Sequence, residues 1–247
     1  FVVYSTIVQA AGGRSILVPL KKGRHDLETM ASKITSSTKL VFIASPNNPT
    51  GTINTASEFG RFMERLPEDI IVVVDEAYHE YVTAKDYPDT LQYLKNGRNI
   101  IILRTFSKIY GLAGFRIGYG LTKESFVNYM NRVRQPFNTS SLAQRAALFA
   151  LSDHGHVKES RRINEEGKRF LYKEFKSLCI DYIPTEANFI YIDLKMDSKK
   201  IYDRLLKKGV IVRPMGPTQL RITIGLPEEN RRFIQTLKEI LQKTGRL

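Results

Sequence analysis

The chain has 247 residues, of which 42% are hydrophobic, and its 38 Lys and Arg against 25 Asp and Glu give a net charge of +13. This size allows one large domain or two modest ones with real cores, and no run approaches the roughly 18 apolar residues of a transmembrane helix, so we expect no membrane association. The single Cys179 excludes an intramolecular disulfide and fits a reducing cytoplasm, and its apolar neighbours predict that it is buried.

The first half of the chain alternates predicted strands and helices. Strands are expected at residues 15–19, 40–44, 70–75, 99–104 and 116–120, and helices at 3–11, 27–32, 55–65 and 123–132. Gly12-Gly13 is expected to end the first helix. This alternation is typical of a mainly parallel, doubly wound α/β sheet.

The second half has a different pattern. Helices are expected at 142–151 and 157–178, followed by strand 189–194, helix 201–208, strands 210–212 and 220–224, and helix 230–244. We therefore predict a large α/β domain at residues 1–152 and a small C-terminal α+β domain at 153–247.

The basic residues occur mostly as scattered pairs with acids between them, and no zinc-finger or RNA-binding signature is present. We therefore expect no nucleic-acid partner. The glycine motifs of dinucleotide and P-loop sites are absent as well. The four histidines have too few potential ligands nearby to predict a metal site.

The stretch from Ser107 to Arg116 places a lysine beside hydroxyls, directly after a predicted strand. The amine of Lys108 can bond to an aldehyde, and the hydroxyls together with Arg116 can hold a phosphate. Pyridoxal phosphate (PLP) carries both an aldehyde and a phosphate. Because Ser-Lys is a common dipeptide, a solvated surface lysine is the alternative.

Two other segments also follow predicted strands. Ser45-Pro46-Asn47-Asn48-Pro49-Thr50-Gly51 comes after strand 40–44, and Asp75 ends the apolar run 70–74. A carboxylate at the end of a buried strand needs a partner, although a helix N-cap or a structural ion pair would explain it too, and the first segment could be an ordinary turn. All three segments lie at carboxyl ends of strands, where open α/β sheets bind ligands.

Together the three segments resemble the fold type I PLP enzymes, the aspartate aminotransferase superfamily. The resemblance implies the PLP-transferase fold, a three-layer α/β large domain with a small C-terminal α+β domain, and it implies PLP as cofactor. Lys108 matches the catalytic lysine that bonds to the PLP aldehyde, and Asp75 matches the acid that pairs with the pyridine nitrogen. Tyr78 and Asn48 match residues that hydrogen-bond the 3-oxygen of the PLP ring.

The resemblance assigns further residues to the same cofactor. Part of the phosphate cup is matched by Thr105, Ser107 and Arg116. Phe1 stands where the superfamily carries the aromatic ring that stacks on PLP. The family's earlier segments, including a helix end that helps to bind the phosphate, have no match here, so we expect the chain to be an N-terminally incomplete part of a longer protein.

Residues 131–138, 209–214 and 220–225 resemble the histidinol-phosphate aminotransferases, and the resemblance runs from Phe1 to about Ile240. It implies that Arg221 and Arg213, with Asn48, bind the substrate. The implied reaction exchanges an amino group between L-histidinol phosphate and 2-oxoglutarate, forming glutamate, in a cytoplasmic homodimer of histidine biosynthesis. An aromatic aminotransferase, a threonine-phosphate decarboxylase and a non-catalytic fragment are the alternatives.

Overall fold

The computed structural model describes residues 1–243, which divide into two compact units. The first unit contains Phe1–Asn48 and Thr52–His154. The second contains the short segment Pro49–Gly51 and the chain from Gly155 onward. Each unit has its own sheet and its own core.

The first unit is built on a four-stranded sheet in the order β1-β2-β3-β4. Its strands are β1 (Leu40–Ala44), β2 (Ile71–Asp75), β3 (Ile100–Thr105) and β4 (Gly118–Leu121). β1, β2 and β3 run parallel, and β4 pairs with β3 in the antiparallel direction. Six α-helices accompany these strands among the described residues, namely α1 (Val3–Ala10), α2 (Leu27–Ser32), α3 (Ala56–Arg65), α4 (Thr90–Lys95), α5 (Glu124–Val133) and α6 (Ser141–Ser152).

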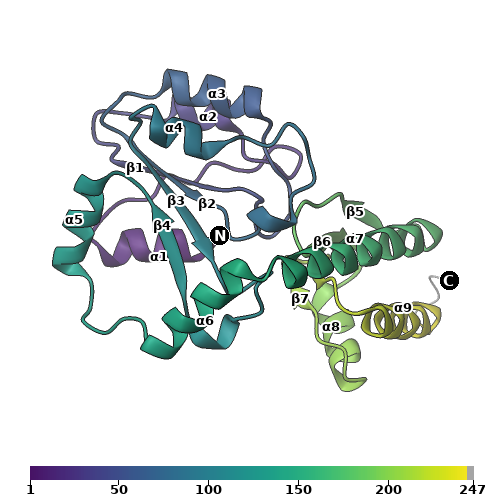
Figure 1. Ribbon diagram of the computed structural model, residues 1–247. Coiled ribbons are helices and arrows are strands. Elements are labelled where there is room, and N and C mark those ends of the chain that lie inside the picture. The colour runs from purple at the N-terminus through teal and green to yellow at the C-terminus, as the bar shows by residue number, and fades with distance from the viewer. Residues whose placement is uncertain (244–247) are drawn as a thin grey trace. The chain divides into compact units, whose positions relative to one another are not determined.

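Helices cover this sheet on two sides (Figure 1). α2, α3 and α4 lie on one face, where Phe59 and Phe62 of α3 pack with Val41 and Ile43 of β1 in a buried apolar core. Side chains alternate along a strand, so Phe42 points to the other face. There it stacks on Tyr4 of α1, with the ring centroids 5.0 Å apart.

The second unit has a four-stranded antiparallel sheet in the order β5-β6-β8-β7. Its strands are β5 (Asp181–Ile183), β6 (Phe189–Asp193), β7 (Arg213–Pro214) and β8 (Gln219–Thr223). α7 (His154–Ser177), α8 (Ser198–Lys207) and α9 (Pro227–Gln242) accompany them. Apolar residues of these helices and of β6 and β8 form one buried cluster, which includes Leu171, Phe175, Ile190 and Leu237.

Most expected elements are present within a few residues, but three predictions were wrong. Residues 15–19 form no strand: no neighbouring strand pairs with them among the described residues, and Leu17 is 78% exposed. Residues 210–212 are not a strand either, because the pairing with β8 begins only at Arg213. Cys179 is exposed and lies in the turn that follows α7, where it adopts a left-handed conformation with φ of 51°.

Four short elements were not expected, and one predicted element lies partly outside the described part. The missed elements are α4, β5 and the 3₁₀ helices η1 (His79–Tyr81) and η2 (Ala113–Phe115). The end of the predicted helix 230–244 falls on Thr244, which lies outside the described residues, while α9 ends at Gln242. Gly12, with φ of 74°, follows the end of α1 as predicted.

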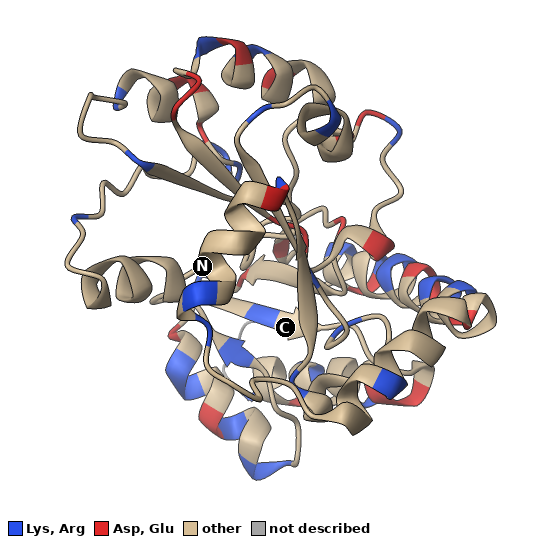
Figure 2. Ribbon diagram, turned by 60° about the vertical axis from the view of Figure 1, so that its left-hand side comes forward, with Lys and Arg blue, Asp and Glu red and all other residues tan. Residues whose placement is uncertain are grey.

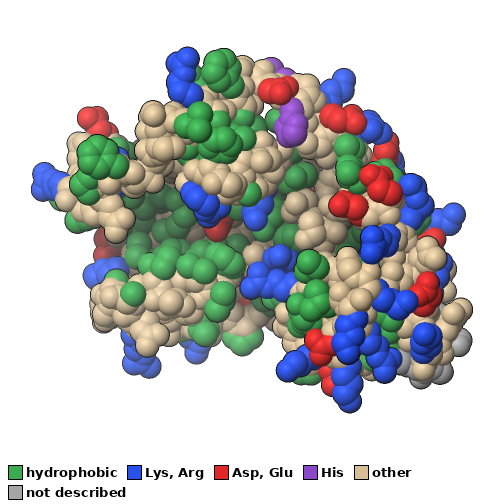
Figure 3. Space-filling model, turned by 90° about the horizontal axis from the view of Figure 1, so that it is seen from below, with side chains coloured by type: hydrophobic (Ala, Val, Ile, Leu, Met, Phe, Trp, Pro, Cys, Tyr) green, Lys and Arg blue, Asp and Glu red, His purple; other side chains and the backbone are tan. Residues whose placement is uncertain are grey.

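The surface shows two features of composition. Basic and acidic positions are interspersed along the helices of each unit rather than gathered in one block (Figure 2). In the first unit, exposed apolar side chains gather on the face formed by α1, α5 and α6 (Figure 3), among them Ile7, Met130, Val133, Leu148 and Phe149. Within residues 1–243, none of the helices combines the length and apolar character needed to cross a bilayer.

Candidate active site

The parallel strands β1 and β2 end at the same level, and β3 continues to Thr105. Ala44 of β1 is in register with Asp75 of β2, which in turn is in register with Leu103 of β3. The chain stays paired one residue further, because Ser45 donates its N–H to the Asp75 carbonyl at 2.9 Å and Glu76 donates to the Leu103 carbonyl at 2.8 Å. The segments that carry Asn48, Tyr78 and Lys108 therefore leave the sheet at one edge.

The carboxylate of Asp75 is held by two donors. The backbone N–H of Ala77 donates to Oδ1 at 3.0 Å, and the hydroxyl of Tyr4 donates to Oδ2 at 2.6 Å. Burial, and after it the charge of Asp75, raise the pKa of Tyr4 far above its ordinary value, so this hydroxyl keeps its proton and acts as a donor.

Tyr4 is a residue that the sequence did not single out. Its ring lies edge-on to Phe1, with centroids 5.6 Å apart, and it joins α1 to the end of β2. The only signal in the sequence was its position one helical turn after Phe1, and such a spacing does not reveal a partner 71 residues away.

Lys108 lies in the turn after β3 and is exposed. Its Nζ is 5.5 Å from the ring centroid of Tyr78, which is buried. The turn is fixed by the N–H of Gly111, which donates to the Lys108 carbonyl at 3.0 Å, and by Gly111 itself, whose φ of 69° favours glycine. The structure therefore brings the predicted lysine and the predicted tyrosine together.

The residues predicted for the phosphate cup lie on the segments next to the β3–β4 pairing. The hydroxyl of Thr105 accepts the N–H of Ser107 at 3.0 Å, and Thr105 is in register with Gly118, two residues after Arg116. A Cβ at Gly118 would lie 2.7 Å from a backbone oxygen, so this close approach requires glycine. Arg116 is exposed and left-handed, with φ of 52°, and its Nη1 donates to the Ala113 carbonyl at 2.7 Å.

A buried ion pair lies next to Asp75. Glu76 is fully buried and accepts hydrogen bonds from Thr90 at 2.5 Å and from Arg104 Nε at 2.9 Å. Arg104 Nη2 also lies 2.8 Å from the same carboxylate. Within the described residues, the structural ion pair at this strand end is therefore made by Glu76 and not by Asp75, whose carboxylate points to the α1 side and bonds Tyr4.

Two arginines stand opposite each other in the second unit. Arg213 of β7 is in register with Arg221 of β8. Arg221 is half-buried, with its guanidinium carbon 4.8 Å from the ring centroid of Phe189, whereas Arg213 is exposed. Like charges directly across a sheet are unfavourable, and an anion held between them would relieve the repulsion. The pair thus has the chemistry of a carboxylate or phosphate site.

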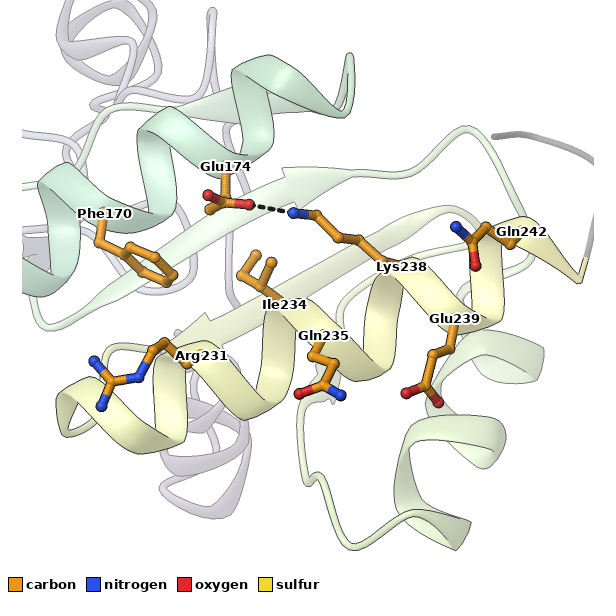
Figure 4. Close-up of a pocket in the computed structure, with 8 residues that line it drawn as sticks. All are labelled: Phe170, Glu174, Arg231, Ile234, Gln235, Lys238, Glu239 and Gln242. Carbon is orange, nitrogen blue, oxygen red and sulfur yellow. Dashed lines mark hydrogen bonds and ion pairs between the residues drawn. The ribbon is translucent and has the colours of Figure 1, made fainter.

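A groove elsewhere in the second unit involves none of the predicted residues. It runs between α7 and α9, with Phe170 and Ile234 as apolar contacts and an ion pair of 2.6 Å between Lys238 and Glu174 (Figure 4). Both charge signs line it, so it does not favour one kind of ligand. Among residues 1–243, no three His, Cys, Asp or Glu side chains come together as a metal site.

The profile of the family described as aminotransferase class I and II matches residues 1–237. The chain belongs to this family. Among similar curated aminotransferases, the histidinol-phosphate aminotransferase of Moorella thermoacetica is 51% identical over 98% of this chain and 64% of its own length. Histidinol-phosphate aminotransferase 1 of Nitrosococcus oceani is 48% identical over 98% of this chain and 67% of its own length.

A solved aminotransferase structure has the same fold as this chain. Histidinol-phosphate aminotransferase from Sinorhizobium meliloti, in complex with pyridoxal-5'-phosphate, superposes with a TM-score of 0.90 at 29% identity, covering 99% of this chain and 68% of that one. A Pyrococcus horikoshii aromatic aminotransferase, at 24% identity and a TM-score of 0.85, shows the shared fold alone. The expected PLP-transferase fold is thus confirmed. The chain spans only about two thirds of these proteins.

Proposed function

We propose that the protein catalyses PLP-dependent transamination between L-histidinol phosphate and 2-oxoglutarate in histidine biosynthesis. The observation that carries the proposal is the 51% identity to a histidinol-phosphate aminotransferase over 98% of this chain. The aromatic aminotransferase and phosphothreonine decarboxylase structures that share the fold are only 24% and 21% identical, so they favour the fold and not those reactions.

The side chains at the sheet edge fit PLP by their chemistry. An exposed amine, Lys108, suits the aldehyde, and the carboxylate of Asp75 suits a protonated pyridine nitrogen. Hydroxyls of Thr105 and Ser107 with the guanidinium of Arg116 suit a phosphate. We assign Tyr78 and Asn48 to the ring oxygen and Phe1 to the ring face. When bound, PLP supplies an aldehyde that bonds to amines and a ring that withdraws electrons from the carbon that carries the bound amine.

The chain's own groups then have separate tasks. Lys108 would act as the general base and acid: its amine would take the proton from the amine-bearing carbon of the substrate and deliver it to the carbon that carries the aldehyde of the cofactor. Asp75 keeps a negative charge beside the ring nitrogen and so holds the proton there. The Tyr4 hydroxyl, which donates to Oδ2 at 2.6 Å, orients that carboxylate.

The arginine pair explains how one protein would accept two substrates. One substrate ends in a phosphate and the other in a carboxylate, and a guanidinium binds either anion through two parallel N–H bonds. We assign Arg221 to both anions and Arg213 mainly to the phosphate. The net charge of +13 favours the approach of anionic substrates.

Two further properties belong to this proposal. We infer a cytoplasmic enzyme, as a biosynthetic role and a single cysteine suggest. We also infer a homodimer, because exposed apolar side chains gather on the face formed by α1, α5 and α6, and such a gathering marks an interaction surface. Sedimentation of the whole protein tests the dimer, and a monomer at micromolar concentration would contradict it.

Absorbance and turnover test the reaction. The whole protein with PLP should absorb in the visible range, and borohydride should fix the cofactor on Lys108, as peptide mapping would reveal. Turnover of histidinol phosphate should exceed that of phenylalanine and of threonine phosphate. A cofactor fixed on another lysine would overturn the assignment of Lys108, and preference for another substrate would overturn the proposed reaction.

A further inference from the structure

Three polar side chains on one face of α7 bond to one short backbone segment. Asn164, Lys168 and Tyr172 follow each other at intervals of four residues, so they lie in a row along the helix. Asn164 donates to the Ala187 carbonyl at 3.3 Å, and Lys168 donates to the Thr185 carbonyl at 3.2 Å. The Tyr172 hydroxyl accepts the N–H of Thr185 at 2.8 Å.

This row is unusual because Lys168 is only 5% exposed. A buried ammonium is costly without compensation, and the carboxylate of Glu165 supplies it at 2.6 Å. The Thr185 hydroxyl in turn accepts the N–H of Ala187 at 2.9 Å, so the segment from Thr185 to Ala187 is fixed from both sides. A core position filled by a lysine instead of an apolar residue suggests that the conformation of this segment matters.

The fixed segment receives the turn Pro49–Gly51, which belongs to the same unit. Glu186 donates its N–H to the Gly51 carbonyl at 2.8 Å. Thr185 packs so closely on Gly51 that a Cβ there would lie 1.8 Å from the Thr185 hydroxyl oxygen. Gly51 also has φ of 73°, so both its backbone conformation and its surroundings require glycine.

The turn is part of a small closed loop. The N–H of Asn47 donates to the Thr52 carbonyl at 2.8 Å, which leaves the chain between them little freedom. Asn48 stands in this loop, directly before Pro49. The position of Gly51 therefore limits where the backbone of Asn48, from which its side chain starts, can lie.

We propose that Asn164, Lys168 and Tyr172 form, through Thr185–Ala187, a seat for the Pro49–Gly51 turn, and that the seat positions Asn48. The three helix residues are positioning residues, since each acts through the backbone of another segment. The functional consequence rests on the proposed role of Asn48 at the ring oxygen and the substrate. The seat itself rests only on the contacts described above.

Residue-resolved amide hydrogen exchange of the whole protein tests the seat directly. Lys168→Met removes the amine and keeps a similar length, so the amides of Glu186 and Asn47, which bond within the seat and the loop, should exchange about tenfold faster. Lys173→Met, an exposed position on the same helix, is the matched control and should leave both amides unchanged. Unchanged exchange in Lys168→Met would overturn the seat.

Gly51→Ala disturbs the same contact from the side of the turn, and it serves as the test if Lys168→Met does not fold. The same two amides should exchange faster. Gly97→Ala carries similar backbone strain, with φ of 77°, but its Cβ would meet nothing within 4 Å, so it should leave them unchanged. Equal effects of the two glycine variants on Glu186 would mean that strain and not the seat is responsible, which contradicts the proposal.

Kinetics test the positioning of Asn48. In Lys168→Met we expect kcat/KM for histidinol phosphate to fall about tenfold, with the amides of the Phe175 core unaffected. Faster exchange at Glu186 with normal kcat/KM would overturn the positioning role. If the unaltered protein does not turn over histidinol phosphate, the proposed function falls, while the exchange results still decide the seat.

Discussion

Replacing Arg221 with lysine tests the substrate assignment most directly. Lysine keeps the positive charge but loses the planar fork that gives two parallel hydrogen bonds to one anion. The rest of the site is retained, because a lysine amine can also lie over the Phe189 ring, where the Arg221 guanidinium carbon is 4.8 Å from the centroid. The substitution therefore removes about one charge-assisted hydrogen bond.

Such a bond contributes about 1.5–3 kcal/mol. We expect kcat/KM of Arg221→Lys to fall about ten- to a hundredfold for histidinol phosphate and for glutamate alike, because the proposed function assigns both anions to this guanidinium. Arg213→Lys should affect histidinol phosphate more than glutamate, since Arg213 is exposed and assigned to the phosphate. Arg204→Lys, on the exposed side of α8, is the control and should change neither value.

The assay is steady-state kinetics of the whole protein with each substrate, together with the stability of the second unit. Arg213 and Arg221 are directly opposite each other on the neighbouring strands β7 and β8, so Arg213→Gln should leave the unfolding midpoint unchanged or raise it slightly. The same substitution should weaken binding of the phosphate substrate. If Arg221→Lys were as active as the unaltered enzyme, the arginine pair would not be the anion site, and the reasoning from cross-strand repulsion would be refuted.

Four further outcomes are expected, three at the candidate site and one at a buried histidine. Lys108→Ala should abolish transamination and leave the circular dichroism spectrum unchanged, whereas residual turnover near the normal rate would exclude it as the proton carrier. Asp75→Asn should lower kcat by several powers of ten with little change in KM, because the amide keeps the shape of the carboxylate but not the charge that would hold the proton on the ring nitrogen; steady-state kinetics decide. Tyr4→Phe removes a hydrogen bond to a charged group and should lower kcat about tenfold, with normal kcat arguing against an orienting role. Burial lowers the pKa of His25 from 6.5 to about 4, so the unfolded chain binds a proton on this residue more tightly than the folded protein does. The free energy of unfolding should therefore fall by about 3 kcal/mol as the pH is lowered from 6.5 towards 4. Urea midpoints should show this slope in the unaltered protein and not in His25→Asn.

The sequence predicted the carboxyl ends of β1, β2 and β3 well, because the signals that mark them are local. The apolar runs of β1, β2 and β3 have strand length and end in polar segments, and the parallel register then brings Asp75 level with Ala44 and Leu103. The chemistry of Lys108 and Asp75 could be inferred from residue type and this position. Their proposed roles depend on the resemblance as well.

Long-range contacts were beyond what patterns could predict. Tyr4 bonds Asp75 across 71 positions, and nothing near either residue indicates the other. The seat for Gly51 was missed for the same reason, because Thr185 and Lys168 are both far from Gly51 in the sequence. In addition, a lysine in a highly charged helix predicts a solvated side chain, whereas Lys168 is buried. At residues 15–19 the sequence pattern predicted a strand that does not form, because residues of high β-propensity need a partner strand to pair with.

At the end of β2, two adjacent acidic residues have different surroundings, and we expect one of them to serve stability and the other the proposed catalysis. Side chains of an extended chain alternate between faces, so Glu76 follows Val74 into the core beneath α4, whereas Asp75 follows Val73 to the side of α1. Glu76 is fully buried with Arg104 and Thr90, and removing one partner of such a pair costs about 3–5 kcal/mol. Asp75 is half-buried and is held by Tyr4 and a backbone amide. Glu76→Gln should therefore lower the unfolding midpoint and leave the kinetics of the folded fraction close to normal, while Asp75→Asn should do the reverse. If Glu76→Gln instead lost activity at full stability, the alternation of roles along this strand would be wrong, and the buried ion pair would belong to the site.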